Sequence, residues 1–179
     1  MHTQRREPRV GLCIGPPFVD SSLAHRAFPW CTCSDYAIGS SPYSLSLFST
    51  TTSATNITAT FVVNALDTPA RPSTCFNILQ DNGVEKIELA SSDVCRPSLV
   101  ATTVAGAPKS WSWQSFGPGR QVMKLVNLFL DFDTADGVEV TITLNRSGLC
   151  PTWNTFFRGA YAIFNSDMKC CPRGDLAQP

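Results

Sequence analysis

Hydrophobic and polar residues alternate along much of the chain, with the period of two that is typical of half-buried β-strands. Tyr43, Leu45 and Leu47, for example, alternate with serines. Alternation of this kind predicts four strands, over 43–47, 57–63, 86–89 and 110–114. Short apolar runs predict two more strands, over 99–104 and 161–164. In the strand 86–89, we expect Lys86 and Glu88 to form the solvent-facing side.

The clearest pattern predicts a β-hairpin between residues 126 and 144. Apolar residues mark one face of each strand, at Val126, Leu128, Leu130 and Phe132 and at Val138, Val140, Ile142 and Leu144. The intervening Asp133–Gly137 ends in an Asp-Gly step, which readily adopts the positive φ of a tight turn.

Helical periodicity is nearly absent, and only 73–80 and 152–158 could each form a short helix. Seven or eight strands with this spacing predict an all-β fold, a single disulfide-crosslinked antiparallel β-sandwich with one or two short helices. Three parts are expected along the chain: an irregular N-terminal arm (1–26), one domain (27–172) and a loose tail (173–179).

Amino-acid composition argues against several classes of function. Of 179 residues, fourteen are basic and fourteen acidic, and 43% are hydrophobic. This balance argues against a nucleic-acid partner, and no apolar run is long enough for a membrane span. His2 and His25 are the two histidines, and both precede the predicted strands. Triads that contain histidine and histidine-bound zinc are therefore not expected in the folded body; we expect no enzyme, no cofactor and no metal.

Eight cysteines are present, an even number with irregular spacing: Cys13, Cys31, Cys33, Cys75, Cys95, Cys150, Cys170 and Cys171. The spacing suits zinc poorly, so we expect disulfides and an oxidising compartment. The adjacent Cys170 and Cys171 should bond to different partners, because a disulfide between neighbours strains the peptide. No apolar secretory segment follows the polar and basic residues 1–12.

Carboxylates suggest two further chemistries. Asp131, Asp133 and Asp136, followed by Gly137, resemble a calcium loop, but their spacing departs from the EF-hand pattern and a turn explains them more simply. A glycosidase would need two carboxylates across a cleft, and nothing in the spacing selects a pair from Asp131, Asp133, Glu85 and Glu88.

Three surface features remain. Asn56 and Asn145 begin N-glycosylation sequons. Trp111 and Trp113 share one strand face, where they form either a ligand platform for sugars or polyproline or, as we favour, part of the core. Arg173-Gly174-Asp175 resembles an adhesion tripeptide and also occurs by chance in flexible tails.

Several motifs in order resemble the pherophorin domain of volvocine green algae. They are 28–33 (FPWCTC), 41–45 (SPYSL), 86–89 (KIEL) followed by Cys95, 135–137 (ADG), 150–152 (CPT), 161–165 (YAIFN) and 170–172 (CCP). The resemblance spans about residues 28–172.

This resemblance implies a secreted glycoprotein module of an extracellular matrix, cell wall or flagellar surface fibre. Its expected partners are other matrix glycoproteins, including proline- or hydroxyproline-rich segments in the polyproline II (PPII) conformation, and glycans. A secreted signalling glycoprotein, similar to a sex inducer of the family, is the alternative. Family members commonly carry further cysteines near the positions of Thr60 and Thr141, and two more between Cys150 and Tyr161. Their absence here suggests that whole disulfides were lost together.

Overall fold

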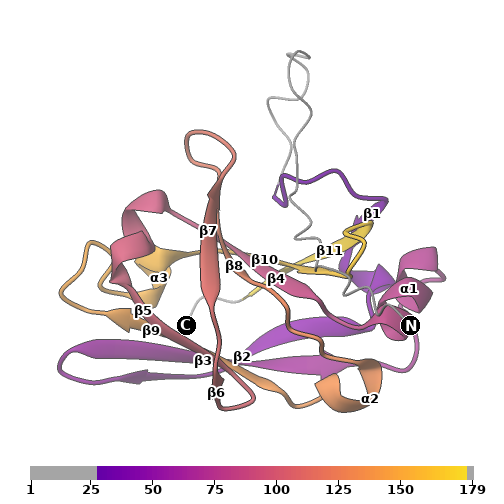
Figure 1. Ribbon diagram of the computed structural model, residues 1–179, viewed down its shortest axis with the longest axis horizontal. Helices are drawn as coiled ribbons and strands as arrows, with labels where there is room; N and C mark the ends of the chain where they lie inside the picture. Colours follow the sequence, from indigo (N-terminus) through magenta and orange to yellow (C-terminus); the bar gives the residue numbers. More distant parts are fainter. Residues whose placement is uncertain (1–27, 177–179) are drawn as a thin grey trace, which may run out of the picture.

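The computed structural model describes residues 28–176, which fold into two stacked β-sheets with short helical segments (Figure 1). Along the chain the elements are β1 (Asp35–Ala37), η2 (Ile38–Ser40), β2 (Tyr43–Thr52), β3 (Asn56–Ala65), α1 (Thr74–Asn82), β4 (Lys86–Ser91), η3 (Asp93–Ser98), β5 (Leu99–Val104), β6 (Ala107–Pro108), β7 (Trp111–Ser115), β8 (Gln121–Leu125), α2 (Phe132–Ala135), β9 (Glu139–Asn145), α3 (Trp153–Phe156), β10 (Phe157–Phe164) and β11 (Cys170–Asp175).

The first sheet has six strands in the order β1-β11-β10-β4-β8-β7, and the second has five in the order β2-β3-β9-β5-β6. All pairings are antiparallel except that of β1 with β11. The predicted β-sandwich is therefore correct in its class. Its helical content was underestimated, because η2, η3 and α2 accompany the two expected helices.

The main core lies between the sheets and contains the inward residues of the alternating strands. Phe61 and Val63 of β3, for example, pack there with Ile87 and Leu89 of β4. Aromatic rings fill the space beneath α3, where Trp153 lies 5.1 Å from Phe61, measured between ring centroids. Burial of these faces is the main source of stability of such a sandwich.

A second, smaller core covers the outer face of the six-stranded sheet. The N-terminal segment that carries Phe28 and Cys31 packs there against small and apolar residues of the sheet, among them Val122, Ala162 and Phe164. β4 is consequently buried on both faces, and β8 and β10 are buried along most of their length.

The predicted hairpin between 126 and 144 is wrong. β8 ends at Leu125 in the six-stranded sheet, whereas β9 lies in the five-stranded sheet between β3 and β5. Between these strands the backbone has positive φ at Asn127 (56°) and Phe129 (52°), which breaks the extended conformation. The chain then crosses to the other sheet through α2.

The two predicted helices are confirmed, and their ends follow capping rules. The Ser73 side chain accepts a hydrogen bond from the Cys75 N–H at the start of α1, and Gly83 with φ of 69° ends this helix. Thr152 and Thr155 form a capping box around the single turn of α3.

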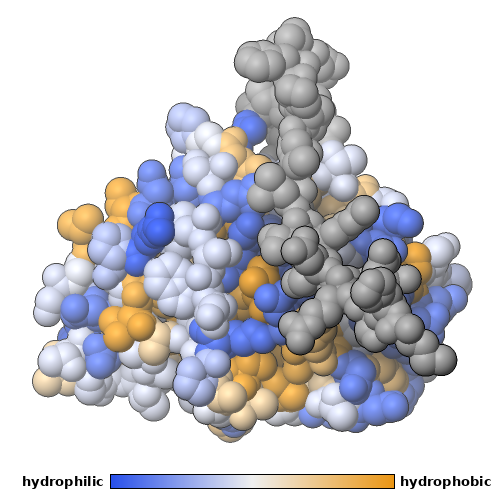
Figure 2. Space-filling model, viewed as in Figure 1, coloured by the Kyte–Doolittle hydropathy of each residue, from blue (hydrophilic) through white to orange (hydrophobic). Residues whose placement is uncertain are grey.

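Several large apolar side chains are exposed on the surface. Phe48, Phe129 and Leu149 are the most exposed, at 69%, 74% and 73%. Figure 2 shows apolar groups gathered near the lower centre of one face, with smaller ones elsewhere among hydrophilic residues. No helix within residues 28–176 is long and apolar enough to cross a membrane.

Candidate functional site

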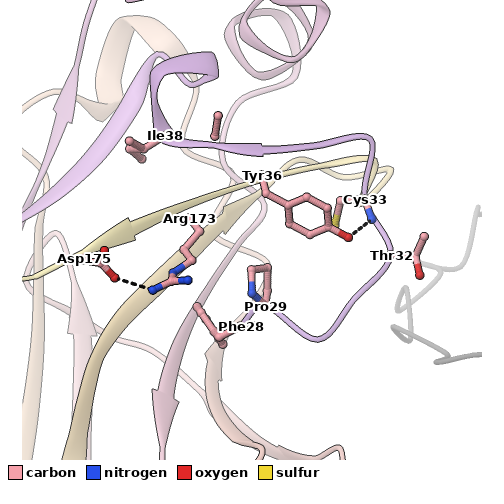
Figure 3. Close-up of a pocket in the computed structure, with 9 residues that line it drawn as sticks. Phe28, Pro29, Thr32, Cys33, Tyr36, Ile38, Arg173 and Asp175 are labelled. Carbon is pink, nitrogen blue, oxygen red and sulfur yellow. Dashed lines mark hydrogen bonds and ion pairs between the residues drawn. The ribbon is translucent and has the colours of Figure 1, made fainter. Parts of the chain in front are cut away.

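A hollow of about 770 Å³ opens between the segment 28–38 and strand β11 (Figure 3). Phe28, Pro29, Tyr36 and Ile38 supply apolar and aromatic walls. Tyr36 and Ile38 are each 38% exposed, so both are available for contact. Apolar and aromatic walls with a few polar groups beside them are features of ligand sites, so the hollow is the candidate binding site.

Tyr36 also holds the loop that forms this hollow. Its hydroxyl accepts a hydrogen bond from the Cys33 N–H at 2.9 Å and donates one to the Cys31 carbonyl at 2.8 Å. The ring is therefore fixed in position, and less conformational entropy would be lost when a ligand packs on it.

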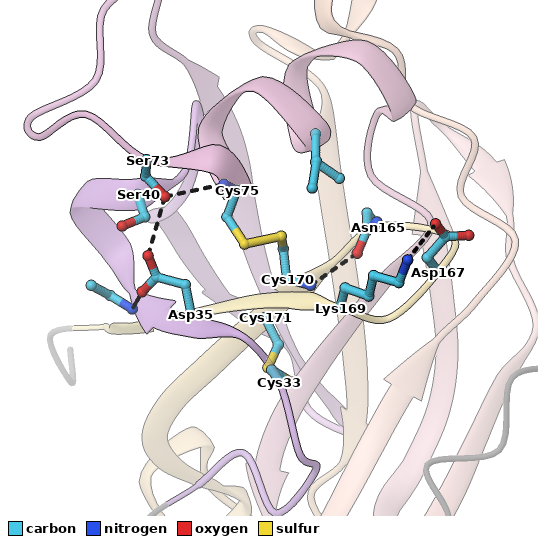
Figure 4. The surroundings of a disulfide bond; sticks show 12 residues. Cys33, Asp35, Ser40, Ser73, Cys75, Asn165, Asp167, Lys169, Cys170 and Cys171 are labelled. Atoms are coloured by element: carbon cyan, nitrogen blue, oxygen red, sulfur yellow. Dashed lines mark hydrogen bonds and ion pairs between the residues drawn. A yellow bond between two sulfur atoms is a disulfide. The ribbon is translucent and has the colours of Figure 1, made fainter.

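Two disulfides anchor the same region (Figure 4). Cys33 bonds to Cys171, and Cys75 bonds to Cys170. Because successive strand residues point to opposite faces, Cys170 lies in the main core and Cys171 in the second core. The prediction that these neighbours have different partners is thus confirmed.

The remaining cysteines complete the expected framework as far as the structure describes it. Cys95 bonds to Cys150 and joins η3 to the loop after β9. Cys31 is also disulfide-bonded. Cys13 lies outside the described residues.

Asp35 of β1 is the centre of a polar network behind the hollow. Its carboxylate accepts hydrogen bonds from the Ala37 N–H, from the Ser73 hydroxyl and, twice, from the Arg71 guanidinium. Desolvation by itself raises the pKa of Asp35, but hydrogen bonds from Ala37, Ser40, Arg71 and Ser73 outweigh it and lower the pKa to about 2. The network ties β1 to the segment before α1.

The Arg173-Gly174-Asp175 sequence lies in β11 and not in a loose tail, which corrects the predicted tail boundary at 173. Arg173 and Asp175 line the hollow and form an ion pair at 2.9 Å. Gly174 is required for packing, since a Cβ atom there would lie 2.2 Å from the Tyr161 ring. The tripeptide is therefore part of a rigid strand.

Lys86 and Glu88 do not face solvent, contrary to the sequence prediction. Both are buried under the second core, and their side chains form an ion pair at 2.7 Å. The Lys86 ammonium also lies 3.7 Å from the centroid of the Phe164 ring. Nearby, burial lowers the pKa of Lys124, an effect that Lys86 reinforces and Glu88 opposes.

The other carboxylates considered above do not form a cluster. Asp131 caps α2 through a hydrogen bond from the Thr134 N–H, and Asp136 accepts one from the Ala65 N–H. Within residues 28–176, no three metal-ligating side chains group together. Partial burial raises the pKa of Glu85. A hydrogen bond from the Asn127 N–H and the positive charge of Lys109 partly oppose this shift.

The two sequons occupy one place on the five-stranded sheet. Asn56 of β3 and Asn145 of β9 are direct register partners. Their strand neighbours Ile57 and Leu144 are paired on the inner side, so the two asparagines share the outer face. The Asn145 side chain accepts a hydrogen bond from the Ser147 N–H at 2.8 Å. Glycosylation at both sites stays a prediction.

Trp111 and Trp113 lie on β7, an edge strand of the six-stranded sheet. Both are partly buried and pack against the main core, and the Trp113 ring meets the Phe156 ring at a centroid distance of 6.0 Å. This placement favours the core interpretation. A ligand platform at these residues stays a prediction.

Sequence reasoning missed the hollow. Its walls come from two segments far apart in the sequence, which the disulfide between Cys33 and Cys171 joins across a separation of 138 residues. The sequence feature that could have indicated the hollow was the closely spaced Cys31 and Cys33 near Tyr36 and Ile38. The sequence alone, however, does not identify the disulfide partner of Cys33.

Comparison with known proteins identifies the family. The family model described as Pherophorin matches residues 28–172. No curated protein and no solved structure matches the chain. Pherophorins are structural extracellular-matrix proteins, and the match covers nearly all of the described residues, with their disulfides and two stacked sheets. The chain therefore belongs to the Pherophorin family.

Proposed function

We propose that the protein is a non-catalytic interaction module of an algal extracellular matrix, cell wall or flagellar surface fibre. Its partner is an extended proline- or hydroxyproline-rich segment of another matrix glycoprotein, and the binding site is the hollow between residues 28–38 and β11. The observation that carries the proposal is the fixed aromatic wall of this hollow, beside the Arg173–Asp175 ion pair.

The chemistry of a PPII segment suits these walls. Such a segment is already extended and has no internal hydrogen bonds, so its binding costs little conformational entropy. Its pyrrolidine rings pack on aromatic surfaces such as Tyr36, while its carbonyls accept hydrogen bonds from side-chain donors at the rim. Arg173 is a suitable donor, because a guanidinium has five N–H groups and only one is used in the described hydrogen bond to Asp175.

A calorimetric titration with a hydroxyproline-rich peptide tests the proposal, against a Gly/Ser peptide of equal length. We expect Ile38→Ala and Arg173→Ala to weaken binding at least about tenfold, because each removes one wall contact. Val100→Ala is the matched control, since Val100 is an exposed aliphatic residue on β5 of the other sheet. Equal affinity for both peptides, or an equal loss in the Val100 variant, would contradict the proposal.

Extraction distinguishes this function from the signalling alternative. A matrix module should require chaotrope or high salt for release from the producing cells. A diffusing signal protein should appear in the medium without either treatment.

A further inference from the structure

The two halves of the outer edge of β2 differ in whether their backbone groups already have hydrogen-bond partners. The Ser41 hydroxyl accepts a hydrogen bond from the Tyr43 N–H and donates one to the Tyr43 carbonyl. The Leu45 N–H donates a hydrogen bond to the Tyr161 hydroxyl. The first half of this edge is therefore closed to any additional strand.

The second half of the edge is open. An inserted residue, Phe48, interrupts the register with β3, after which Ser49 pairs with Thr60 and Thr51 with Thr58. Val63 exchanges backbone hydrogen bonds with the β9 side, at Gly137 and Val138. By alternation, Thr58 and Thr60 bond to β2 through Thr51 and Ser49, so the N–H and C=O groups of Thr50 and Thr52 point outward.

Nothing in the described part of the chain covers these groups. β2 pairs with β3 alone, and among residues 28–176 no hydrogen bond is recorded to the backbone of Thr50 or Thr52 from the outer side. The strand Tyr43–Thr52 also lacks a charged residue and a proline, the two usual means of protecting an edge. Phe48, 69% exposed, stands at the start of the open half.

We propose that this open edge pairs with the same edge of a second copy of the chain. An antiparallel arrangement centred on Thr50 satisfies a two-fold axis, because Thr50 then faces Thr50 of the second copy and Phe48 faces Thr52. The N–H and C=O groups of Thr50 point outward in both copies, so the two hydrogen bonds between the Thr50 residues are reciprocal. The absence of charge on β2 removes the repulsion that like edges would otherwise meet.

The dimer would leave the hollow accessible. In Figure 1 the β2–β3 turn lies at the left end of the molecule, whereas β1, which lines the hollow, lies toward the right. If the hollow binds PPII segments as proposed above, the dimer is bivalent and can crosslink two such segments. The pairing itself does not depend on that function.

Sedimentation of the full chain over a range of concentrations tests the pairing. We expect the dimer to dissociate on dilution, and Phe48→Lys to weaken association at least about tenfold by placing a charge in the edge. Leu149→Lys is the matched control, since Leu149 is 73% exposed and lies outside β2, and it should dimerise like the wild type.

Amide hydrogen exchange gives a second readout that needs no variant. Exchange at Thr50 and Thr52 should slow as the concentration rises, while exchange at exposed loop amides stays constant. A chain that is monomeric throughout, a dimer unaffected by Phe48→Lys, or a dimer without protection at Thr50 and Thr52 would each overturn the proposal.

Discussion

The hydroxyl of Tyr161 accepts a hydrogen bond from the backbone N–H of Leu45 at 3.0 Å and so joins the two sheets. Tyr161 belongs to β10 of one sheet and Leu45 to β2 of the other. Both residues are buried, so water cannot replace either partner. This bond both fixes the stacking of the sheets and closes part of the β2 edge.

Tyr161→Phe should therefore lower the free energy of unfolding by about 1–3 kcal/mol, because it leaves the Leu45 N–H buried without an acceptor. Tyr43→Phe is the matched control. Tyr43 is equally buried, and its hydroxyl has no hydrogen-bond partner among the described residues. That substitution should be neutral or stabilising in urea unfolding. Equal losses in the two variants would show that the Leu45 bond has no special role.

Gly174→Ala should destabilise the protein by about 1–3 kcal/mol, since the new methyl group would overlap the buried Tyr161 ring. Thermal unfolding measures the effect. Gly39→Ala is the control, because its Cβ would lie 3.3 Å from the Ala70 Cβ, a contact that needs only a slight shift. A Gly174 variant as stable as the Gly39 variant would refute the packing role of Gly174.

The sequence predicted most strands of the sandwich because alternation identifies which residues share a face. It did not predict how many layers cover each face. Lys86 and Glu88 alternate with Ile87 and Leu89 as a solvent-facing pair would, yet the second core buries them. A layer supplied by residues distant in the sequence leaves no periodic signal in the strand that it covers.

The failed hairpin has a related cause. Residues 126–132 have the period of a strand, and the next apolar segment follows after a turn-like sequence. Pairing, however, depends on which sheet accepts each strand, and β9 pairs with β3 and β5 instead. The hollow was missed for a similar reason, since its walls meet only once β11 lies beside β1.

The buried ion pair makes a sharp prediction about non-additivity. Lys86→Met or Glu88→Leu alone should cost about 3–5 kcal/mol, because each leaves the other charge buried without its ion-pair partner. The double variant Lys86→Met/Glu88→Leu should cost less than either single variant, because neither charge of the buried pair is left without the other. Urea unfolding of all four proteins completes the cycle. Additive losses would argue that the two side chains act independently.

Asp35 should produce an acid-dependent loss of stability. Its pKa is about 2 in the folded protein against an ordinary value of 3.8, so its contribution is present above about pH 4 and disappears as the pH falls toward 2. We expect a loss of roughly 1 kcal/mol across this interval, reduced by solvent because the Arg71 side chain is 56% exposed. Asp35→Asn should remove this part of the pH dependence in urea unfolding. Asp167→Asn, which breaks an exposed pair of 3.9 Å with Lys169, should leave it unchanged.

Thr60 and Thr141, near which the pherophorin resemblance implies two lost cysteines, are direct register partners on β3 and β9. The backbone groups of Thr60 point toward β2, so this is a non-hydrogen-bonded pair, in which the Cβ atoms approach most closely. The double variant Thr60→Cys/Thr141→Cys should therefore form a disulfide during oxidative folding without disturbing the existing ones. A non-reducing peptide map would detect the new crosslink.

The diagonal variant Thr60→Cys/Thr143→Cys is the control and should retain two free thiols, because diagonal neighbours lie about 7–8 Å apart. A crosslink in the diagonal variant but not in the direct one would mean that the β3–β9 register differs from that described here. Formation in the direct variant alone would support the expectation from the resemblance that two such cysteines were lost together as one disulfide.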